Sequence, residues 1–112
     1  MMRDLYISAL ETSFERFRPR FKDKLELSFN KDKADPNLLY FTSAAINFKT
    51  DLAFGLIVIY DSGFYDIHVM NNDENYDSIF IETHTFTTED ALNEIVEGTL
   101  QRVIALEKIS DS

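Results

Sequence analysis

Short connections between successive apolar segments constrain the fold of this sequence more than any other feature. Five segments have the alternation or the β-branched and aromatic content of β-strands, at 24–29, 38–48, 55–60, 64–70 and 78–86. The polar stretches between them are shorter than the crossover of about a dozen residues that a parallel pair of strands requires. The sequence therefore predicts antiparallel pairing of consecutive strands, which is a meander sheet.

The two ends of the chain have the periodicity of helices. Apolar side chains recur at spacings of three and four in residues 2–18, which places them on one helical face. These side chains are Tyr6, Leu10, Phe14 and Phe17. Pro19 is expected to end this helix, because proline disfavours helical backbone at the residue before it.

A second helix is expected to begin at Thr87, which has an N-capping side chain, with Asp90 three residues later. Its apolar stripe consists of Leu92, Ile95, Val96, Thr99, Val103 and Leu106. The predicted fold is therefore α+β, with one domain that spans residues 1–112. It is an antiparallel meander sheet of about five strands, flanked by an N-terminal and a C-terminal helix.

The residue types that enzyme and cofactor sites require are scarce in this sequence. Cysteine is absent, which excludes disulfides, thiolate metal sites and cysteine nucleophiles. The three glycines form no phosphate-binding loop, and there is no His-Glu-x-x-His motif. We therefore expect a protein that is not an enzyme and carries no cofactor. No signal-like segment and no apolar run of membrane-spanning length is present, so a cytoplasmic location is expected.

Charge is divided unevenly along the chain, whose net charge is −9. Residues 1–33 hold eight of the eleven basic side chains, and residues 34–112 hold fourteen of the twenty acidic ones. A negative surface repels nucleic acids and anionic membranes and favours basic partners. The charge therefore predicts a basic protein partner, no membrane association and, in general, no nucleic-acid binding.

The acidic residues outside the strands form two candidate partner-binding segments. One is the loop that contains Asp73, Glu74 and Asp77, and the other is the outer face of the last helix, with Asp90, Glu94 and Glu97. Together they resemble a phosphate array or a plug for a basic groove. The leading hypothesis is a non-catalytic acidic protein–protein interaction module, such as an inhibitor, an immunity protein or an assembly accessory of a phage or mobile element. The simpler explanation is a solvated helix face and a polar loop.

A histidine–carboxylate cluster is expected on the fourth and fifth strands. If their apolar side chains share one face, the opposite face carries Asp66, His68, Glu82 and His84. Two imidazoles and two carboxylates are suitable ligands for a divalent metal, and they predict a metal- or small-ligand-binding protein as an alternative function. The competing explanation is a pair of cross-strand ion pairs that stabilise the hairpin.

Basic and aromatic residues alternate after the first helical stripe. The basic side chains are Arg16, Arg18, Arg20, Lys22 and Lys24, interleaved with phenylalanines. Such a pattern is typical of single-stranded nucleic-acid binding and predicts, as a further alternative, a nucleic-acid accessory protein. The phenylalanines also fit the buried face of the helix, and the arginines suit its C-terminus.

The central strand, 55–60, is apolar on both of its faces. Two helices on one side of the sheet would leave an apolar face exposed, which is unusual for a monomer. We therefore expect either that the helices divide between the two faces or that the second face forms a homodimer.

Overall fold

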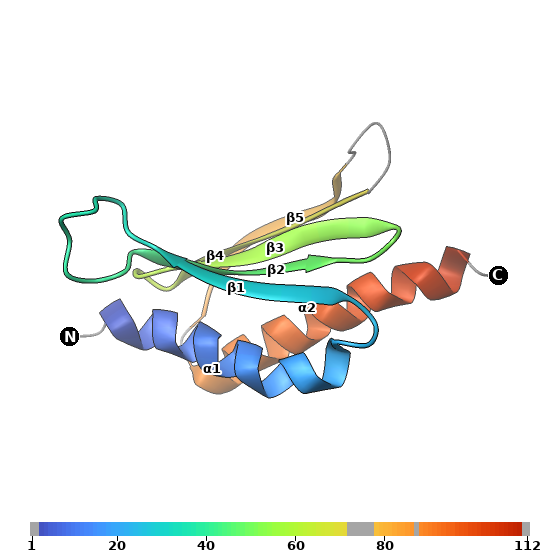
Figure 1. Cartoon of the computed structure of the whole chain (residues 1–112), viewed down its shortest axis with the longest axis horizontal. Coiled ribbons are helices and arrows are strands. Elements are labelled where there is room, and N and C mark those ends of the chain that lie inside the picture. The colour runs from blue at the N-terminus through green and yellow to red at the C-terminus, as the bar shows by residue number, and fades with distance from the viewer. Residues whose placement is uncertain (1–2, 72–77, 87, 111–112) are drawn as a thin grey trace.

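The computed structural model describes residues 3–71, 78–86 and 88–110. The elements along the chain are α1 (Arg3–Phe21), β1 (Glu26–Asp32), β2 (Ser43–Lys49), β3 (Ala53–Tyr60), β4 (Phe64–Asn71), β5 (Ser78–Thr85) and α2 (Glu89–Ser110). The five strands form one sheet in the order β1-β2-β3-β4-β5, and each pair is antiparallel (Figure 1). The predicted α+β fold with a meander sheet and two terminal helices is confirmed.

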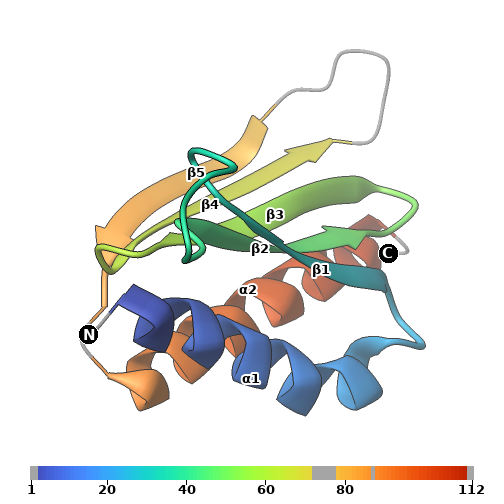
Figure 2. The same cartoon turned by 60° about the vertical axis from the view of Figure 1, so that its left-hand side comes forward.

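Both helices lie on the same side of the sheet and pack against each other (Figure 2). The core lies between the helix layer and the sheet, and its fully buried side chains come from both. Those from the central strand are Ala53, Ile57 and Ile59, which are the alternate residues that point toward the helices. The helices therefore do not divide between the faces, and the opposite face of the sheet has no helix against it.

Helix α1 continues through Pro19 to Phe21, so the expected end of this helix is wrong. A proline inside a helix costs about 3 kcal/mol, because it has no N–H to donate to the carbonyl of Glu15 and its ring crowds that carbonyl. Burial of a phenylalanine stabilises by about 1.5–3 kcal/mol, and the Phe21 side chain is only 4% exposed. Burial of Phe21 offsets most of that cost, and Arg20 adds contacts with Glu97 and with the rings of Phe17 and Phe21.

The first two strands differ from the expected ranges at their loop ends. β1 extends to Asp32, because Leu27, Phe29 and Lys31 continue one alternating face. β2 begins only at Ser43, and the alanines after it are extended rather than helical. Ala44 is fully buried on the helix side of the sheet, which accounts for the strand conformation.

Local hydrogen bonds fix the turn between β3 and β4 and the start of α2. Gly63 has a φ of 91°, as its place after Asp61 and Ser62 predicts, and its N–H donates to the Tyr60 carbonyl at 3.0 Å. At the start of α2, the Ala91 N–H donates to Thr88 Oγ1 at 3.1 Å. Thr88 is therefore the N-cap in place of the expected Thr87, which lies outside the described residues.

Candidate functional site: the uncovered face of the sheet

The face of the sheet opposite the helices, called here the uncovered face, carries a group of apolar side chains, called here the apolar patch, with Asp66 and His68 among them. It consists of Phe54, Leu56, Val58 and Tyr60 from β3, Phe64 and Met70 from β4, and Ile81 from β5. These residues alternate with the buried ones along their strands. Phe64 is 50% exposed and Ile81 is 53% exposed, although both are large apolar side chains. The other side of the same strands is buried beneath the helices.

A carboxylate with two hydroxyl partners lies within this apolar surface. Asp66 is opposite Val58 on one side and opposite Thr83 on the other. The Tyr60 hydroxyl donates to Asp66 Oδ2 at 3.0 Å, and the Thr83 hydroxyl donates to Asp66 Oδ1 at 2.7 Å. Each carboxylate oxygen therefore accepts one hydrogen bond, which fixes the plane of the group.

The Tyr60 phenol has a raised pKa, chiefly because of burial and also because of the hydrogen bond to Asp66 and its negative charge. A phenol with a raised pKa keeps its proton and remains a donor. This contact was not predicted from the sequence, because it depends on the pairing of three strands rather than on spacing along one.

An open cavity of about 790 Å³ lies over this group of side chains. Its walls come from three places: the strands, with Tyr60, Phe64, Asp66 and Thr83; the β3–β4 turn, with Asp61 and Ser62; and the start and end of the loop between β1 and β2. The loop is tied to the next turn by a 3.0 Å bond from the Asp61 N–H to the Thr42 carbonyl. The cavity is thus bounded by backbone that is held in place on both sides.

Two lysines near this loop are directed at an aromatic ring. The Nζ atoms of Lys31 and Lys33 lie 4.7 and 5.5 Å from the centre of the Phe41 ring. Lys31 also pairs with Glu11 of α1 at 3.6 Å. Lys33 lines the cavity, but no ion pair joins either lysine to Asp66 among the described residues.

The expected cluster of Asp66, His68, Glu82 and His84 does not form. Asp66 and His68 point to the uncovered face, whereas Glu82 and His84 are opposite Ile67 and Tyr65 and point to the helix side. The pairing shifts between Val69 and Met70, so that β5 carries one additional residue there, and this changes which of its side chains face the helices. The predicted placement of these four residues on one face is therefore wrong, and no group of three or more potential metal ligands is present among the described residues.

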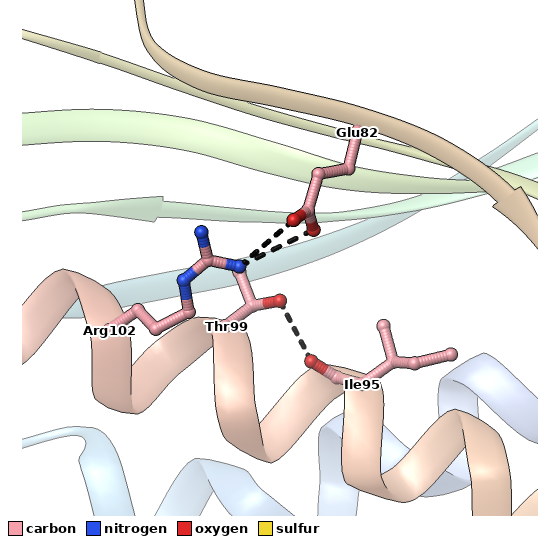
Figure 3. A network of polar contacts seen from close by, with 4 residues as sticks. All are labelled: Glu82, Ile95, Thr99 and Arg102. Atoms are coloured by element: carbon pink, nitrogen blue, oxygen red, sulfur yellow. Dashed lines mark hydrogen bonds and ion pairs between the residues drawn. The ribbon is translucent and has the colours of Figure 1, made fainter.

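The polar side chains that β5 directs toward the helix layer have partners there. Both carboxylate oxygens of Glu82 accept hydrogen bonds from Arg102 Nη1 of α2, at 3.2 and 3.4 Å (Figure 3). One turn earlier, the buried Thr99 hydroxyl donates to the Ile95 carbonyl at 2.8 Å. The His84 ring lies 5.9 Å from that of Tyr65. These contacts stabilise the hairpin edge and do not form a ligand site.

The predicted acidic partner site is described only in part. Asp90 and Glu94 are exposed on α2, as expected. Glu97 instead pairs with Arg20 of α1 at 2.6 Å, so it joins the two helices. The remaining predicted members, Asp73, Glu74 and Asp77, lie outside the described residues.

The predicted nucleic-acid residues are all exposed, but their aromatic neighbours are not. These residues are Arg16, Arg18, Arg20, Lys22 and Lys24. Phe17 and Phe21 are buried, and the Arg20 guanidinium lies over both rings at 5.4 and 5.2 Å. The phenylalanines are therefore not free to stack on bases. Lys22 and Lys24 line one pocket together with Lys49 and with three acidic side chains, those of Asp23, Glu26 and Asp51.

Comparisons of this chain with protein-family models, with curated proteins and with solved structures found no match. Neither of the described helices has the length and apolarity needed to cross a bilayer.

Proposed function

We propose that this chain is a non-catalytic, acidic protein-binding module that binds a basic partner on the uncovered face of its sheet. The observation that supports this proposal is the apolar patch, in which Phe64 and Ile81 remain half exposed, whereas the opposite faces of β3 and β4 are buried. Large contiguous apolar surfaces on small proteins are usually interaction sites. Inhibitors, immunity proteins and assembly accessories that act in the cytoplasm are the kinds of protein that this proposal includes.

Charge favours a basic partner over a neutral or acidic one. The net charge of −9 attracts positively charged proteins and increases their rate of association. Acidic side chains lie on the uncovered face itself, with Glu26 and Asp32 at its β1 edge and Asp66 within the apolar patch. The complementary surface on the partner would have an apolar centre surrounded by basic side chains.

A second copy of this chain is the competing occupant of the uncovered face, and it corresponds to the homodimer expected from the sequence. It would bury the same apolar patch but bring two chains of the same charge together, which costs electrostatic energy. Light scattering of the purified protein distinguishes the two occupants. A species of twice the chain mass that disappears when the patch is mutated would show that a second copy, and not a basic partner, occupies the uncovered face.

The proposal is tested by affinity capture from the native host, followed by binding measurements with each purified candidate. The test variant is Ile81→Lys, which puts a positive charge on the apolar patch. The matched control is Leu52→Lys, because Leu52 is 38% exposed in the turn between β2 and β3 and lies outside the patch. A basic protein whose Kd rises at least tenfold with Ile81→Lys and less than twofold with Leu52→Lys supports the proposal. Equal losses with both variants would remove it.

A further inference from the structure

The cavity over the uncovered face has the features of a site for one positively charged side chain. Four residues form its floor and are called here the Asp66 hollow: Tyr60, Phe64, Asp66 and Thr83. Two of them supply aromatic rings on either side of the β3–β4 turn, one supplies a carboxylate, and one supplies a neutral hydroxyl. Lys33 and Asp61 also line the cavity, so its charged lining consists of two carboxylates and one ammonium group, with a net negative charge.

Asp66 is oriented but not neutralised by its neighbours. Its two hydrogen bonds within the described part of the chain come from uncharged hydroxyls, at 3.0 and 2.7 Å. Each carboxylate oxygen has about two acceptor positions, so roughly one position on each oxygen remains for a ligand. None of the ion pairs among the described residues includes Asp66, and the nearby Lys33 ammonium is directed at the Phe41 ring.

The geometry favours a guanidinium over an ammonium ion. A guanidinium is planar, presents parallel N–H groups that match both oxygens of a carboxylate, and stacks on aromatic rings. The Asp66 carboxylate is fixed in its plane by a hydroxyl on each side, and Phe64 and Tyr60 line the same cavity. A lysine ammonium would satisfy the charge without using the two parallel acceptor positions or the aromatic faces.

We infer that the Asp66 hollow binds the side chain of an arginine residue on the basic partner protein, with the guanidinium paired to Asp66 and packed against Phe64 and Tyr60. A polypeptide is a better occupant than a free cation, because the hollow is open and continues into the apolar patch through Val58, which is opposite Asp66. Residues that flank the arginine would pack on that patch. This inference rests on the proposed function and specifies how the partner is recognised.

The test uses a fluorescein-labelled hexaarginine peptide, with hexalysine as its matched counterpart, and fluorescence anisotropy at low ionic strength. Wild-type protein is expected to bind hexaarginine more tightly than hexalysine. Asp66→Asn is expected to weaken hexaarginine binding about tenfold, as loss of a charge-assisted contact does. Asp90→Asn removes the same charge from the exposed start of α2 and is expected to change Kd less than twofold. Equal losses with both variants would show general attraction to an acidic surface and overturn the inference.

A second variant and a measurement on the wild-type chain keep the result decisive if Asp66→Asn folds poorly. Phe64→Ala is expected to weaken hexaarginine binding at least threefold and to leave hexalysine binding unchanged, because only the guanidinium stacks on the ring. In NMR titrations of the wild-type protein with hexaarginine, the largest amide shifts are expected at the four residues of the hollow. Largest shifts on α2 instead would overturn the inference.

Two further outcomes separate this inference from the function it rests on. If N-acetyl-arginine methylamide binds as tightly as hexaarginine, the hollow is a small-ligand site and the protein-partner assignment is wrong. If a captured basic protein is lost with Ile81→Lys but binds Asp66→Asn as tightly as the wild type, the proposed function stands and the arginine site fails.

Discussion

Arg20 and Glu97 form an ion pair of 2.6 Å that joins α1 to α2 beneath the sheet. The same guanidinium lies over the rings of Phe17 and Phe21, so its position is fixed by packing as well as by charge. Both partners are partly exposed, and exposed ion pairs contribute only about 0–1 kcal/mol. Their combined contact nevertheless covers the end of the helix that continues past Pro19.

Replacement of Arg20 is therefore expected to lower the free energy of unfolding more than replacement of Arg102, which pairs with Glu82 at 3.2 Å. Arg20→Gln removes an ion pair and the cover over two aromatic rings, and a lowering of the free energy of unfolding by about 1–2 kcal/mol is expected. Arg102→Gln is expected to cost less than about 1 kcal/mol. Urea unfolding at low and high salt checks both values. A larger effect of Arg102→Gln would contradict this ranking.

Two glycine-to-alanine substitutions are expected to act in opposite directions. A Cβ atom at Gly55 of β3 would meet the backbone oxygen of His68 at 2.0 Å, whereas one at Gly98 of α2 would meet nothing within 4 Å. Gly98→Ala is expected to stabilise by about 1 kcal/mol, the usual difference in helix propensity. Gly55→Ala should destabilise by more than that, because two paired strands must separate. Thermal melts of the two variants measure the contrast, and a stabilised Gly55→Ala would show the β3–β4 spacing to be wrong.

Ser13→Ala is expected to increase stability. The Ser13 side chain is fully buried in α1, and its hydroxyl has no hydrogen-bond partner among the described residues. Removal of an unsatisfied buried hydroxyl relieves a desolvation penalty of about 1–3 kcal/mol. Thr12→Ala is the control for helix propensity, because Thr12 is the exposed neighbour. The gain in melting temperature should be larger for Ser13→Ala, and a loss would indicate a hydrogen bond to that hydroxyl.

The titration of Tyr60 reports on Asp66. Burial raises the phenol pKa above its ordinary value of 10.0, and the hydrogen bond and charge of Asp66 raise it further. The folded protein therefore holds this proton more tightly than the unfolded chain does. The resulting stabilisation is complete below the unfolded pKa and is lost as the pH rises through the folded one.

In Asp66→Asn the pKa of Tyr60 is expected to fall part of the way toward its ordinary value. That of Tyr65, raised by burial and by the charge of Glu82, should not change. NMR titration of labelled tyrosines, with Tyr60→Phe to assign the signal, measures both values. If the pKa of Tyr60 is the same in Asp66→Asn as in the wild type, the contact between Tyr60 and Asp66 is contradicted.

The order and pairing of the strands were predictable because each depends on a local pattern. Alternation marks the strands, short polar stretches require antiparallel pairing, and Asp61-Ser62-Gly63 is a turn with a positive φ. The apolar character of both faces of β3 also predicted that two helices on one side of the sheet would leave apolar side chains on the other. These features depend on residue types over a few positions.

The residues that form the Asp66 hollow were not predictable, because their proximity depends on register. The additional residue in β5 opposite Val69 and Met70 changes which side chains of that strand face the helices, so that Thr83 is opposite Asp66 while Glu82 and His84 point to the helix side. A period of two cannot reveal where such an irregularity occurs. Similarly, the extension of α1 depends on burial of Phe21, which no local preference encodes.

The meander topology also has a consequence for how the chain folds. Each strand pairs with the next one along the chain. Each hairpin therefore joins residues that are near in sequence, and its formation closes only a small loop. The helix layer is different, because α1 and α2 come from opposite ends of the chain and their contact closes a much longer loop. We therefore expect Ile57→Val in β3 to slow refolding. Leu100→Ala in α2 should mainly accelerate unfolding.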